Sequence, residues 1–440
     1  MNKKTMRITV SSSFLEGEVR APASKSVMIR ALAGALLSRE VTVLHHPSHC
    51  DDALAAAEVV RALGADVVRD EERWEVRGGI ALRDDVLDVG ESGLTARLFI
   101  PLAALLSQPM TITGRGSLLR RPMTMVEEPL RRLGVQVTTA GGYLPVTVQG
   151  PLQGGHTRVD GSKGSQFLTG LLMSLPLADG DSTLEVHDLR SRPYIDLTLD
   201  VMRRFGVEAS HDGDYALFRV RGNQRYRATE LEVEGDWSGG AFLLVAGAVA
   251  GDLVVHGLDS RSTQADRAIL DALAHAGADV TVDDGAIWVR RSTLQPFTFD
   301  ITDCPDLAPP LVCLAAYAEG RSVLRGVGRL REKESDRAAT LQQEAARLGV
   351  RIDIEGEEMI IHGGRVEGGA SEAHHDHRIA MAAAVMALGA RRPVTIHGAE
   401  CVSKSYPRFF DDLRRLGGRV EGNLPRAGTA ETHGDEHDAT

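Results

Sequence analysis

One pattern of hydrophobic and polar positions recurs along the chain. An amphipathic stretch with helical spacing leads into a basic or alanine-rich turn, a glycine and an alternating run typical of a β-strand. The six copies read VVRALGADVV, PLRRLGVQVT, VMRRFGVEAS, ALAHAGADVT, EAARLGVRID and DLRRLGGRVE. Their glycines stand at positions 64, 134, 206, 277, 349 and 417, in steps of 70, 72, 71, 72 and 68 residues. Since glycine readily adopts the left-handed conformation that ends a helix, the pattern predicts six regularly spaced helix-to-strand junctions.

A period of about 70 residues is longer than that of common solenoid repeats. It predicts an α/β fold of six compact modules. The chain has 440 residues, of which 43% are hydrophobic, so it can form two domains, and we expect three modules in each. The midpoint of the repeat falls near the glycine-rich segment 233–242, which suits a hinge. Two similar lobes and a hinge indicate a cleft that closes over a ligand.

The helix predicted in APASKSVMIRALAGALL, residues 21–37, is apolar but begins with two hydroxyls and a cation. These are Ser24, Lys25 and Ser26, and Arg30 follows one turn later. A helix N-terminus carries free N–H groups and partial positive charge. Ser24 or Ser26 fits the N-cap, and the two cations complete a site suited to phosphate or carboxylate. The alternative is a capped helix whose charges point into water.

Similar polar, mostly cationic groups precede apolar helices in nearly every module. They comprise Gly90, Glu91, Ser92, Gly93 and Arg97; Arg120 and Arg121 before Pro122; Ser162, Lys163, Ser165 and Gln166; Ser191, Arg192 and Tyr194; Asp303 and Asp306; Arg331, Lys333, Glu334 and Arg337; Arg378; and Lys404. Each group alone could be a solvated surface, and residues 331–337 could form ion pairs along a helix face. Their repetition favours a cleft for a ligand with two or more anionic groups.

Composition narrows the possible partners. A net charge of −11 disfavours a nucleic-acid surface, so local cations must bind any anionic ligand. The N-terminus has no apolar signal region and no apolar run reaches membrane-spanning length, so we expect no membrane partner and a cytoplasmic location. The four cysteines are widely spaced and lack a CxxC pair, which fits a reducing compartment. The polar tail, residues 426–440, is predicted to be disordered.

Three other chemistries have weaker support. GSKGS at residues 161–165 lacks the spacing of a nucleotide-binding P-loop, and no GxSxG motif indicates a serine hydrolase. His374, His375 and His377 could ligate a metal, but contiguous residues of a helix cannot all face one ion. No HExxH or Cys/His spacing accompanies them. We therefore expect no metal, and a metal-dependent hydrolase is the least supported interpretation.

Taken together, the quoted stretches resemble the 3-phosphoshikimate 1-carboxyvinyltransferase (EPSP synthase) family from about residue 24 to residue 416. The most specific pieces are SKSVMIRAL, GSQFLTGLLM, SRPYIDLTLDVMRRFG, REKESDR, DHRIAMA and SKSYPRFFDDL. The resemblance implies the two-lobed enolpyruvyl-transferase-like fold, an inside-out α/β barrel with three modules in each lobe. It implies a first lobe at residues 21–235 and a second at 1–20 and 236–425, with the chain crossing the hinge twice. It also implies a monomer.

The implied reaction transfers the enolpyruvyl group of phosphoenolpyruvate to the 5-hydroxyl of shikimate 3-phosphate and releases phosphate, without a metal or an organic cofactor. By resemblance, shikimate 3-phosphate would be bound by Lys25, Ser26, Arg30, Ser165, Gln166, Ser191, Asp306 and Lys333. Phosphoenolpyruvate would be bound by Lys25, Gly93, Arg121, Gln166, Arg337, Arg378 and Lys404. Asp306 would be the base, with Glu334 and Lys25 as the other proton-handling groups. Carboxylates among several cations are expected to stay ionised at neutral pH.

Three places depart from the family pattern. Glu91-Ser92-Gly93-Leu94 stands where the family often has Asn-Ala/Ser-Gly-Thr, so Leu94 replaces a small hydroxyl residue. Gly164 stands where serine is common, and we expect a backbone N–H to supply that phosphate contact. Arg329 stands where a polar amide is frequent, so the resemblance assigns no contact to it.

Two other interpretations remain open. The sister enzyme that acts on a UDP-amino sugar typically has a Lys-Asn pair near its start and a reactive cysteine in a first-lobe loop. This chain has Lys25-Ser26, and Cys50 is the only cysteine of its predicted first lobe. A non-catalytic anion-binding relative would not need to keep the proton-handling set together, and all of that set is present: Lys25, Asp306, Glu334 and Lys404.

Overall fold

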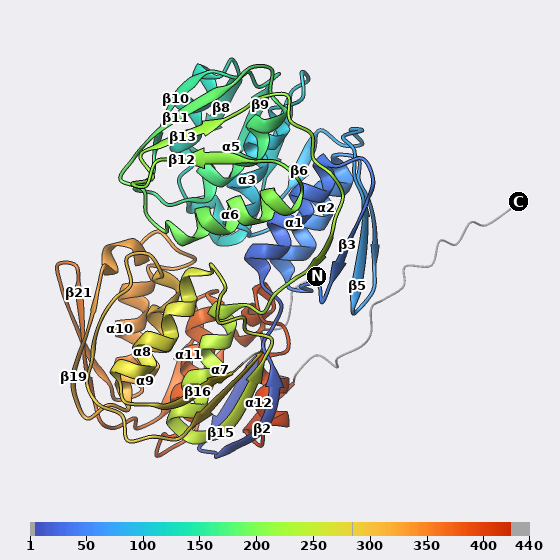
Figure 1. The fold of residues 1–440 in the computed structure, drawn as a ribbon. Coiled ribbons are helices and arrows are strands. Elements are labelled where there is room, and N and C mark those ends of the chain that lie inside the picture. The colour runs from blue at the N-terminus through green and yellow to red at the C-terminus, as the bar shows by residue number, and fades with distance from the viewer. Residues whose placement is uncertain (1–4, 284, 424–440) are drawn as a thin grey trace, which may run out of the picture.

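The computed structural model of the chain describes residues 5–283 and 285–423, so the predicted disordered tail lies outside the described residues. The described strands form six four-stranded sheets, accompanied by twelve α-helices, in two lobes (Figure 1). In every sheet the first pair of strands is parallel and the next two pairs are antiparallel. The six α/β modules predicted from the glycine repeat are confirmed.

The sheets of the upper lobe in Figure 1 come from the first half of the chain. The first has the order β14 (Glu230–Glu232), β3 (Val41–His45), β5 (Arg73–Arg77) and β4 (Asp66–Arg69), with α1 (Lys25–Leu37) and α2 (Asp51–Ala62). The second has the order β6 (Val86–Asp88), β7 (Met110–Thr113), β9 (Tyr143–Gln149) and β8 (Gln136–Ala140), with α3 (Gly93–Ala103) and α4 (Glu127–Arg132). The third has the order β10 (His156–Asp160), β11 (Ser182–His187), β13 (Leu217–Val220) and β12 (Ala209–His211), with α5 (Gln166–Ser174) and α6 (Pro193–Arg204).

The sheets of the lower lobe combine the second half of the chain with the first two strands. One has the order β2 (Leu15–Arg20), β15 (Gly251–His256), β17 (Ala286–Arg290) and β16 (Asp279–Asp283), with α7 (Trp237–Ala250) and α8 (Ile269–His275). Another has the order β18 (Thr298–Asp300), β19 (Gly320–Arg325), β21 (Glu358–Gly363) and β20 (Arg351–Glu355), with α9 (Ala308–Ala316) and α10 (Arg337–Arg347). The last has the order β22 (Gly369–Glu372), β23 (Val394–His397), β1 (Arg7–Ser11) and β24 (Arg419–Gly422), with α11 (His377–Ala387) and α12 (Phe409–Arg415).

Two strands are exchanged between the halves of the chain. β2 precedes α1 in sequence but pairs in parallel with β15, whereas β14 precedes α7 but pairs in parallel with β3. The chain therefore passes twice between the lobes, and the two crossings meet at an antiparallel bridge between Ala23 and Gly235. The lobe boundaries after residues 20 and 235 stay a prediction.

The sheets lie outside and one helix of each module lies inside. Every residue of α3, α7 and α11 is buried. The buried apolar residues form two cores, one from residues 27–233 and one from residues 8–21 and 237–420. This is the predicted inside-out arrangement. Within the described residues, no helix is both long and apolar enough to cross a membrane.

The repeat glycines end α2, α4, α6, α8, α10 and α12, as predicted. Each stands two positions after the last helical residue, with φ between +70° and +120°. At Gly64 the N–H donates to Arg61 O at 3.0 Å, and the N–H of Ala65 donates to Val60 O at 2.9 Å. These bonds satisfy the free carbonyls of the last turn and direct the chain into the next strand.

Candidate active site

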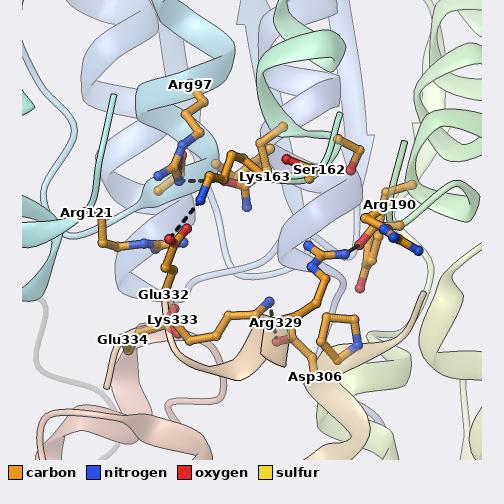
Figure 2. Close-up of a pocket in the computed structure, with 18 of the residues that line it drawn as sticks. Arg97, Arg121, Ser162, Lys163, Arg190, Asp306, Arg329, Glu332, Lys333 and Glu334 are labelled. Atoms are coloured by element: carbon orange, nitrogen blue, oxygen red, sulfur yellow. Dashed lines mark hydrogen bonds and ion pairs between the residues drawn. The ribbon is translucent and has the colours of Figure 1, made fainter. Parts of the chain in front are cut away.

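A cavity of about 660 Å³ lies between the two lobes (Figure 2). Its lining includes the predicted residues Lys25, Ser26, Arg30, Gly93, Arg121, Ser165, Gln166, Ser191, Asp306, Lys333 and Glu334. The remaining predicted residues, Arg337, Arg378 and Lys404, lie beside that lining, where they form ion pairs with Asp306 or Glu334. The fold thus brings together every residue predicted for the site.

Side-chain caps determine where the helices of the site begin. Ser24 Oγ accepts a hydrogen bond from the N–H of Val27 at 3.4 Å, so the first of the two candidate serines is the N-cap of α1. This cap places Lys25 in the first turn. Asp376 caps α11 by accepting a hydrogen bond from the N–H of Arg378 at 3.0 Å. In both lobes a cation therefore stands at the positive end of a helix, an arrangement that favours anionic ligands.

Asp306 is the centre of a charge network in the lower lobe. Its Oδ1 accepts hydrogen bonds from Lys333 Nζ at 3.1 Å and Arg337 Nη1 at 2.8 Å, and its Oδ2 accepts one from Arg378 Nη2 at 3.2 Å. Burial by itself would raise the pKa of Asp306, but the three cations outweigh it and hold the pKa well below its usual range. Asp306 is therefore ionised at neutral pH, as expected from the sequence.

Glu334 lies in a second cluster of cations next to this network. Its Oε2 accepts a hydrogen bond from Arg337 Nη2 at 2.6 Å, and Lys404 Nζ lies 3.9 Å from its Oε1. Burial would raise the pKa of Glu334, but Arg337, Lys404 and Arg121 hold it well below its usual range. Lys404 Nζ also lies 3.7 Å from Oε2 of Glu91, so a carboxylate of the upper lobe approaches the same cation.

Arg337 connects the carboxylates of the lower lobe. Its side chain is 0% exposed. Besides its bonds to Asp306 and Glu334, its Nε and Nη2 donate to Asp376 at 3.0 and 3.2 Å. All of its side-chain nitrogens thus donate to protein carboxylates, so it organises the site, and its predicted contact with phosphoenolpyruvate stays a prediction.

Lys25 is paired with Asp52, a residue not singled out in the sequence. Lys25 Nζ donates to Asp52 Oδ2 at 3.0 Å, and the two side chains are 14% and 5% exposed. Burial lowers the pKa of Lys25, but Asp52 and Glu334 outweigh it and raise the pKa above its usual value. Acidic residues are common in the first turn of any helix, so Asp52 at the start of α2 gives no distinctive signal.

Arg97, noted in the sequence but given no role, helps to shape the upper side of the cavity. Its Nη1 donates to Gln166 Oε1 at 2.9 Å and its Nη2 to Pro122 O at 3.1 Å. Burial and the neighbouring Arg121 lower the pKa of Arg97 to about 9. A Cβ at position 93 would lie 2.4 Å from Arg121 Nη1, so the glycine leaves room for the guanidinium of Arg121 in the position that it occupies here.

Arg30 lines the cavity but is bound to the protein on all of its side-chain nitrogens. It is 1% exposed, and its Nε donates to Thr198 Oγ1 at 2.9 Å and its Nη1 to Ser26 O at 2.8 Å. Its Nη2 donates to Thr169 Oγ1 and Tyr194 O at 3.4 and 3.2 Å. These bonds tie α1 to α5 and α6, and a contact of Arg30 with substrate stays a prediction.

Three cationic side chains keep a buried nitrogen without a hydrogen-bond partner among the described residues. The atoms are Arg121 Nε, Arg378 Nη1 and Lys404 Nζ. A buried donor without a partner costs free energy that an anionic ligand would recover. Because these cations come from both lobes and adjoin Glu334 or Asp306, they mark an anion subsite between the lobes.

The three histidines considered as metal ligands lie in different surroundings. His374 Nε2 lies 2.8 Å from Glu344 Oε1, His375 is exposed and His377 is buried. In the part of the chain that the structure describes, no group of three or more His, Cys, Asp or Glu side chains could hold a metal ion.

Asp266 is a buried carboxylate near the site, and its ionisation should make the stability of the folded protein depend on pH. It is 1% exposed and accepts a hydrogen bond from Ser238 Oγ. Burial, assisted by Asp306, raises its pKa to about 7. Since an unfolded aspartate titrates near ~3.9, the folded state binds more protons between about pH 4 and 7, and its stability falls as the pH rises through that window.

We therefore expect the stability of Asp266→Asn relative to the wild-type protein to increase by about 2–3 kcal/mol between pH 5 and pH 8, because the wild-type protein alone loses stability as Asp266 ionises. Urea unfolding of both proteins at the two pH values measures the difference. An equal difference at both pH values would show that Asp266 does not titrate in this window.

Solved structures identify the class of protein that has this fold. The structure is similar to an EPSP synthase from Acinetobacter baumannii, with a TM-score of 0.82 and 27% sequence identity over 95% of this chain and 100% of that one. It also matches the enolpyruvyl transferase NikO from Streptomyces tendae, with a TM-score of 0.77 over 96% and 99% of the two chains. That second match, at 18% identity, shows the fold alone. The fold is that of an enolpyruvyl transferase.

The sequence profile of the EPSP synthase (3-phosphoshikimate 1-carboxyvinyltransferase) family matches residues 10–413. A 3-phosphoshikimate 1-carboxyvinyltransferase from Aeropyrum pernix is 42% identical over 94% of this chain and 96% of its own length. One from Clostridium kluyveri is 37% identical over 94% and 98%. The chain belongs to the EPSP synthase family, a family of transferases.

Proposed function

We propose that this chain transfers the enolpyruvyl group of phosphoenolpyruvate to the 5-hydroxyl of shikimate 3-phosphate and releases phosphate. The observation that carries the proposal is the anion subsite formed by Arg121, Arg378 and Lys404, next to the ionised Asp306 and Glu334. Two anionic substrates repel each other, and cations from two lobes offset that repulsion while holding the reacting groups together.

The reaction needs one base, one acid and neutralised charge. Asp306 accepts the proton of the 5-hydroxyl as that oxygen bonds to C2 of phosphoenolpyruvate, and Glu334 or Lys25 delivers a proton to the methylene carbon. The bond from C2 to the phosphate oxygen then breaks, the new methyl group loses a proton and the double bond re-forms. Closure of the lobes excludes water from the intermediate.

The cations also control when the carboxylates can move protons. Arg337 forms ion pairs with both Asp306 and Glu334. Together with the other cations around each carboxylate, it keeps both groups ionised. Anionic substrates bound to the same cations would raise the pKa values of both carboxylates. Asp306 would become a stronger base and Glu334 could carry a proton, so acid–base catalysis would depend on both substrates being bound.

The alternative acceptor, a UDP-amino sugar, has less support. Cys50 is 0% exposed, and burial and Asp52 raise the pKa of its thiol to about 11, which does not suit a reactive cysteine. The same proposal holds that the protein acts as a monomer, in the cytoplasm and without a cofactor.

The test is phosphate release from the purified protein supplied with shikimate 3-phosphate and phosphoenolpyruvate in the presence of a chelator. We expect phosphate only when both substrates are present, and loss of release in Lys25→Ala. Binding of shikimate 3-phosphate without release would favour the anion-binding relative, and release only with a UDP-amino sugar would favour the sister enzyme.

Leu94 gives a separate prediction about the phosphoenolpyruvate side of the cavity. It is 8% exposed, lines the cavity and lies in the first turn of α3 beside Gly93. A threonine hydroxyl there would add one hydrogen-bonding group, so we expect Leu94→Thr to change the KM for phosphoenolpyruvate, or inhibition by an analogue that competes with it, by about 2- to 10-fold. Steady-state kinetics measure both values, and no change in either would contradict the prediction.

A further inference from the structure

A second cavity, of about 490 Å³, lies beside the two chain crossings and shares no lining residue with the active-site cavity. Its walls come from β2 and the loop after β15 in the lower lobe, and from α1, α6 and β14 in the upper lobe. A cavity of this size between two lobes is large enough for a small organic molecule.

One wall of this second cavity is apolar. Five lining side chains are aliphatic, and each is at most 4% exposed: Val27, Leu197, Val201, Leu231 and Leu258. A ligand with a hydrocarbon part would remove that part from water by packing against this wall.

Most of the charged side chains in the lining already have a partner. Five of the seven form ion pairs: Arg20 with Glu232 at 3.4 Å, Arg261 with Asp259 at 3.3 Å, and Asp200 with Arg203, outside the lining, at 2.6 Å. The other two are the carboxylate of Glu234 and the guanidinium of Arg204. In the part of the chain that the structure describes, neither has an oppositely charged group within 4.0 Å.

Glu234 is held in the wall of the cavity by the protein. It is partly buried, and its Oε1 accepts a hydrogen bond from Ser262 Oγ at 3.0 Å. Burial raises the pKa of Glu234, although hydrogen bonds from Gln264 and Ser262 and the charge of Arg204 act in the opposite direction. A cationic group of a ligand next to Glu234 would offset the cost of burying its charge.

Arg204 supplies the opposite charge. It lies in the last turn of α6 and is exposed, and its charge influences Glu234 although the two groups are not in contact. A guanidinium binds a carboxylate through two parallel hydrogen bonds. One anion, one cation and an apolar wall therefore suit a ligand that carries an ammonium group, a carboxylate and a hydrocarbon side chain.

We infer that the second cavity binds an α-amino acid with an aliphatic side chain, whose ammonium group pairs with Glu234 and whose carboxylate pairs with Arg204. The side chain packs against the apolar wall. This site is separate from the proposed reaction, because none of its residues lines the active-site cavity.

The experiment measures binding to the full chain by calorimetry, with L-leucine as the probe. Two analogues each lack one of its charged groups: 3-methylbutylamine has no carboxylate, and 4-methylpentanoate has no ammonium group. We expect a Kd of about 10 µM to 1 mM for leucine and Kd values at least about 10-fold higher for both analogues, since each loses a charge-assisted contact.

Variants assign each contact to its residue. Glu234→Gln should bind leucine no better than 4-methylpentanoate, and Arg204→Gln should bind leucine no better than 3-methylbutylamine. Arg204 is exposed, so its variant tests the site even if Glu234→Gln unfolds. Arg225→Gln is the matched control, because Arg225 is exposed and lies outside the lining, and it should keep the wild-type Kd for leucine.

Three results would overturn the inference. Absence of leucine binding to the wild-type protein at about 10 mM would exclude the site. A Kd for either analogue equal to that of leucine would show that one of the two charged groups is not recognised. Leucine binding that neither variant weakens would place the amino acid elsewhere on the protein. None of these measurements requires turnover, so their outcome is independent of the proposed function.

Discussion

Asp306→Asn should lower the kcat of phosphate release by about 10²- to 10⁴-fold, the usual range for removing a general base. The amide has nearly the same shape as the carboxylate, and its oxygen can still accept hydrogen bonds from Lys333 and Arg337, as Oδ1 does, while its NH2 group would replace the oxygen that accepts from Arg378. It cannot accept the proton of the 5-hydroxyl. The loss should therefore appear in kcat, with a much smaller change in the KM for shikimate 3-phosphate.

Asp300→Asn is the matched control for this variant. Asp300 lies six residues earlier and is exposed, and among the described residues its carboxylate accepts one hydrogen bond, from the N–H of Thr302 in the same loop. The control should keep the wild-type kcat. A kcat for Asp306→Asn within tenfold of the wild-type value, with the protein folded, would mean that another group takes the hydroxyl proton.

The fold was largely predictable because each module carries its own local signals. A glycine such as Gly64 ends a helix for reasons confined to five or six residues, and its recurrence reveals the module length. The N-cap of α1 was narrowed to two serines by the same local logic. The lobe assignment of β2 and β14 was implied by the family resemblance alone, because the pairing partner of a short strand depends on distant residues.

The members of the site were predicted better than their roles. Cations before apolar helices pointed to the cavity because helix N-termini attract anions wherever they occur. How each nitrogen is used depends on tertiary packing. Arg30 and Arg337 donate hydrogen bonds to the protein from every side-chain nitrogen, whereas Arg378 and Lys404 each keep a nitrogen without a partner in the part of the chain that the structure describes. No local sequence pattern distinguishes a cation that the protein binds completely from one that keeps a nitrogen for a ligand. The sequence around Asp52 likewise did not distinguish it from other acidic residues in the first turn of a helix.

The largest expected effect on stability comes from Arg337, since it joins three carboxylates at a position with no exposure to solvent. Asp306, Glu334 and Asp376 all accept its hydrogen bonds. Arg337→Met would leave these carboxylates close together and partly uncompensated, and breaking a buried ion pair in this way costs about 3–5 kcal/mol of unfolding free energy. Arg347→Met is the control on the same helix, because the Arg347 side chain is 43% exposed and should contribute at most about 1 kcal/mol.

The pH dependence distinguishes loss of charge compensation from loss of packing. Arg337 helps to depress the pKa values of Asp306 and Glu334, so the stability that it provides is present above the unfolded-state pKa values of these carboxylates and is lost as the pH falls through their folded-state values. Without Arg337 both folded-state pKa values should rise, and protonation should relieve the remaining repulsion. The destabilisation caused by Arg337→Met should therefore be smaller at pH 5 than at pH 8 in urea unfolding.

Arg337→Lys keeps the charge but not the forked geometry of the guanidinium. Its free energy of unfolding should therefore lie between those of the methionine variant and the wild-type protein. If instead Arg337→Met loses the same free energy at both pH values and Arg337→Lys loses as much, the arginine acts by filling space and the carboxylates do not depend on its charge.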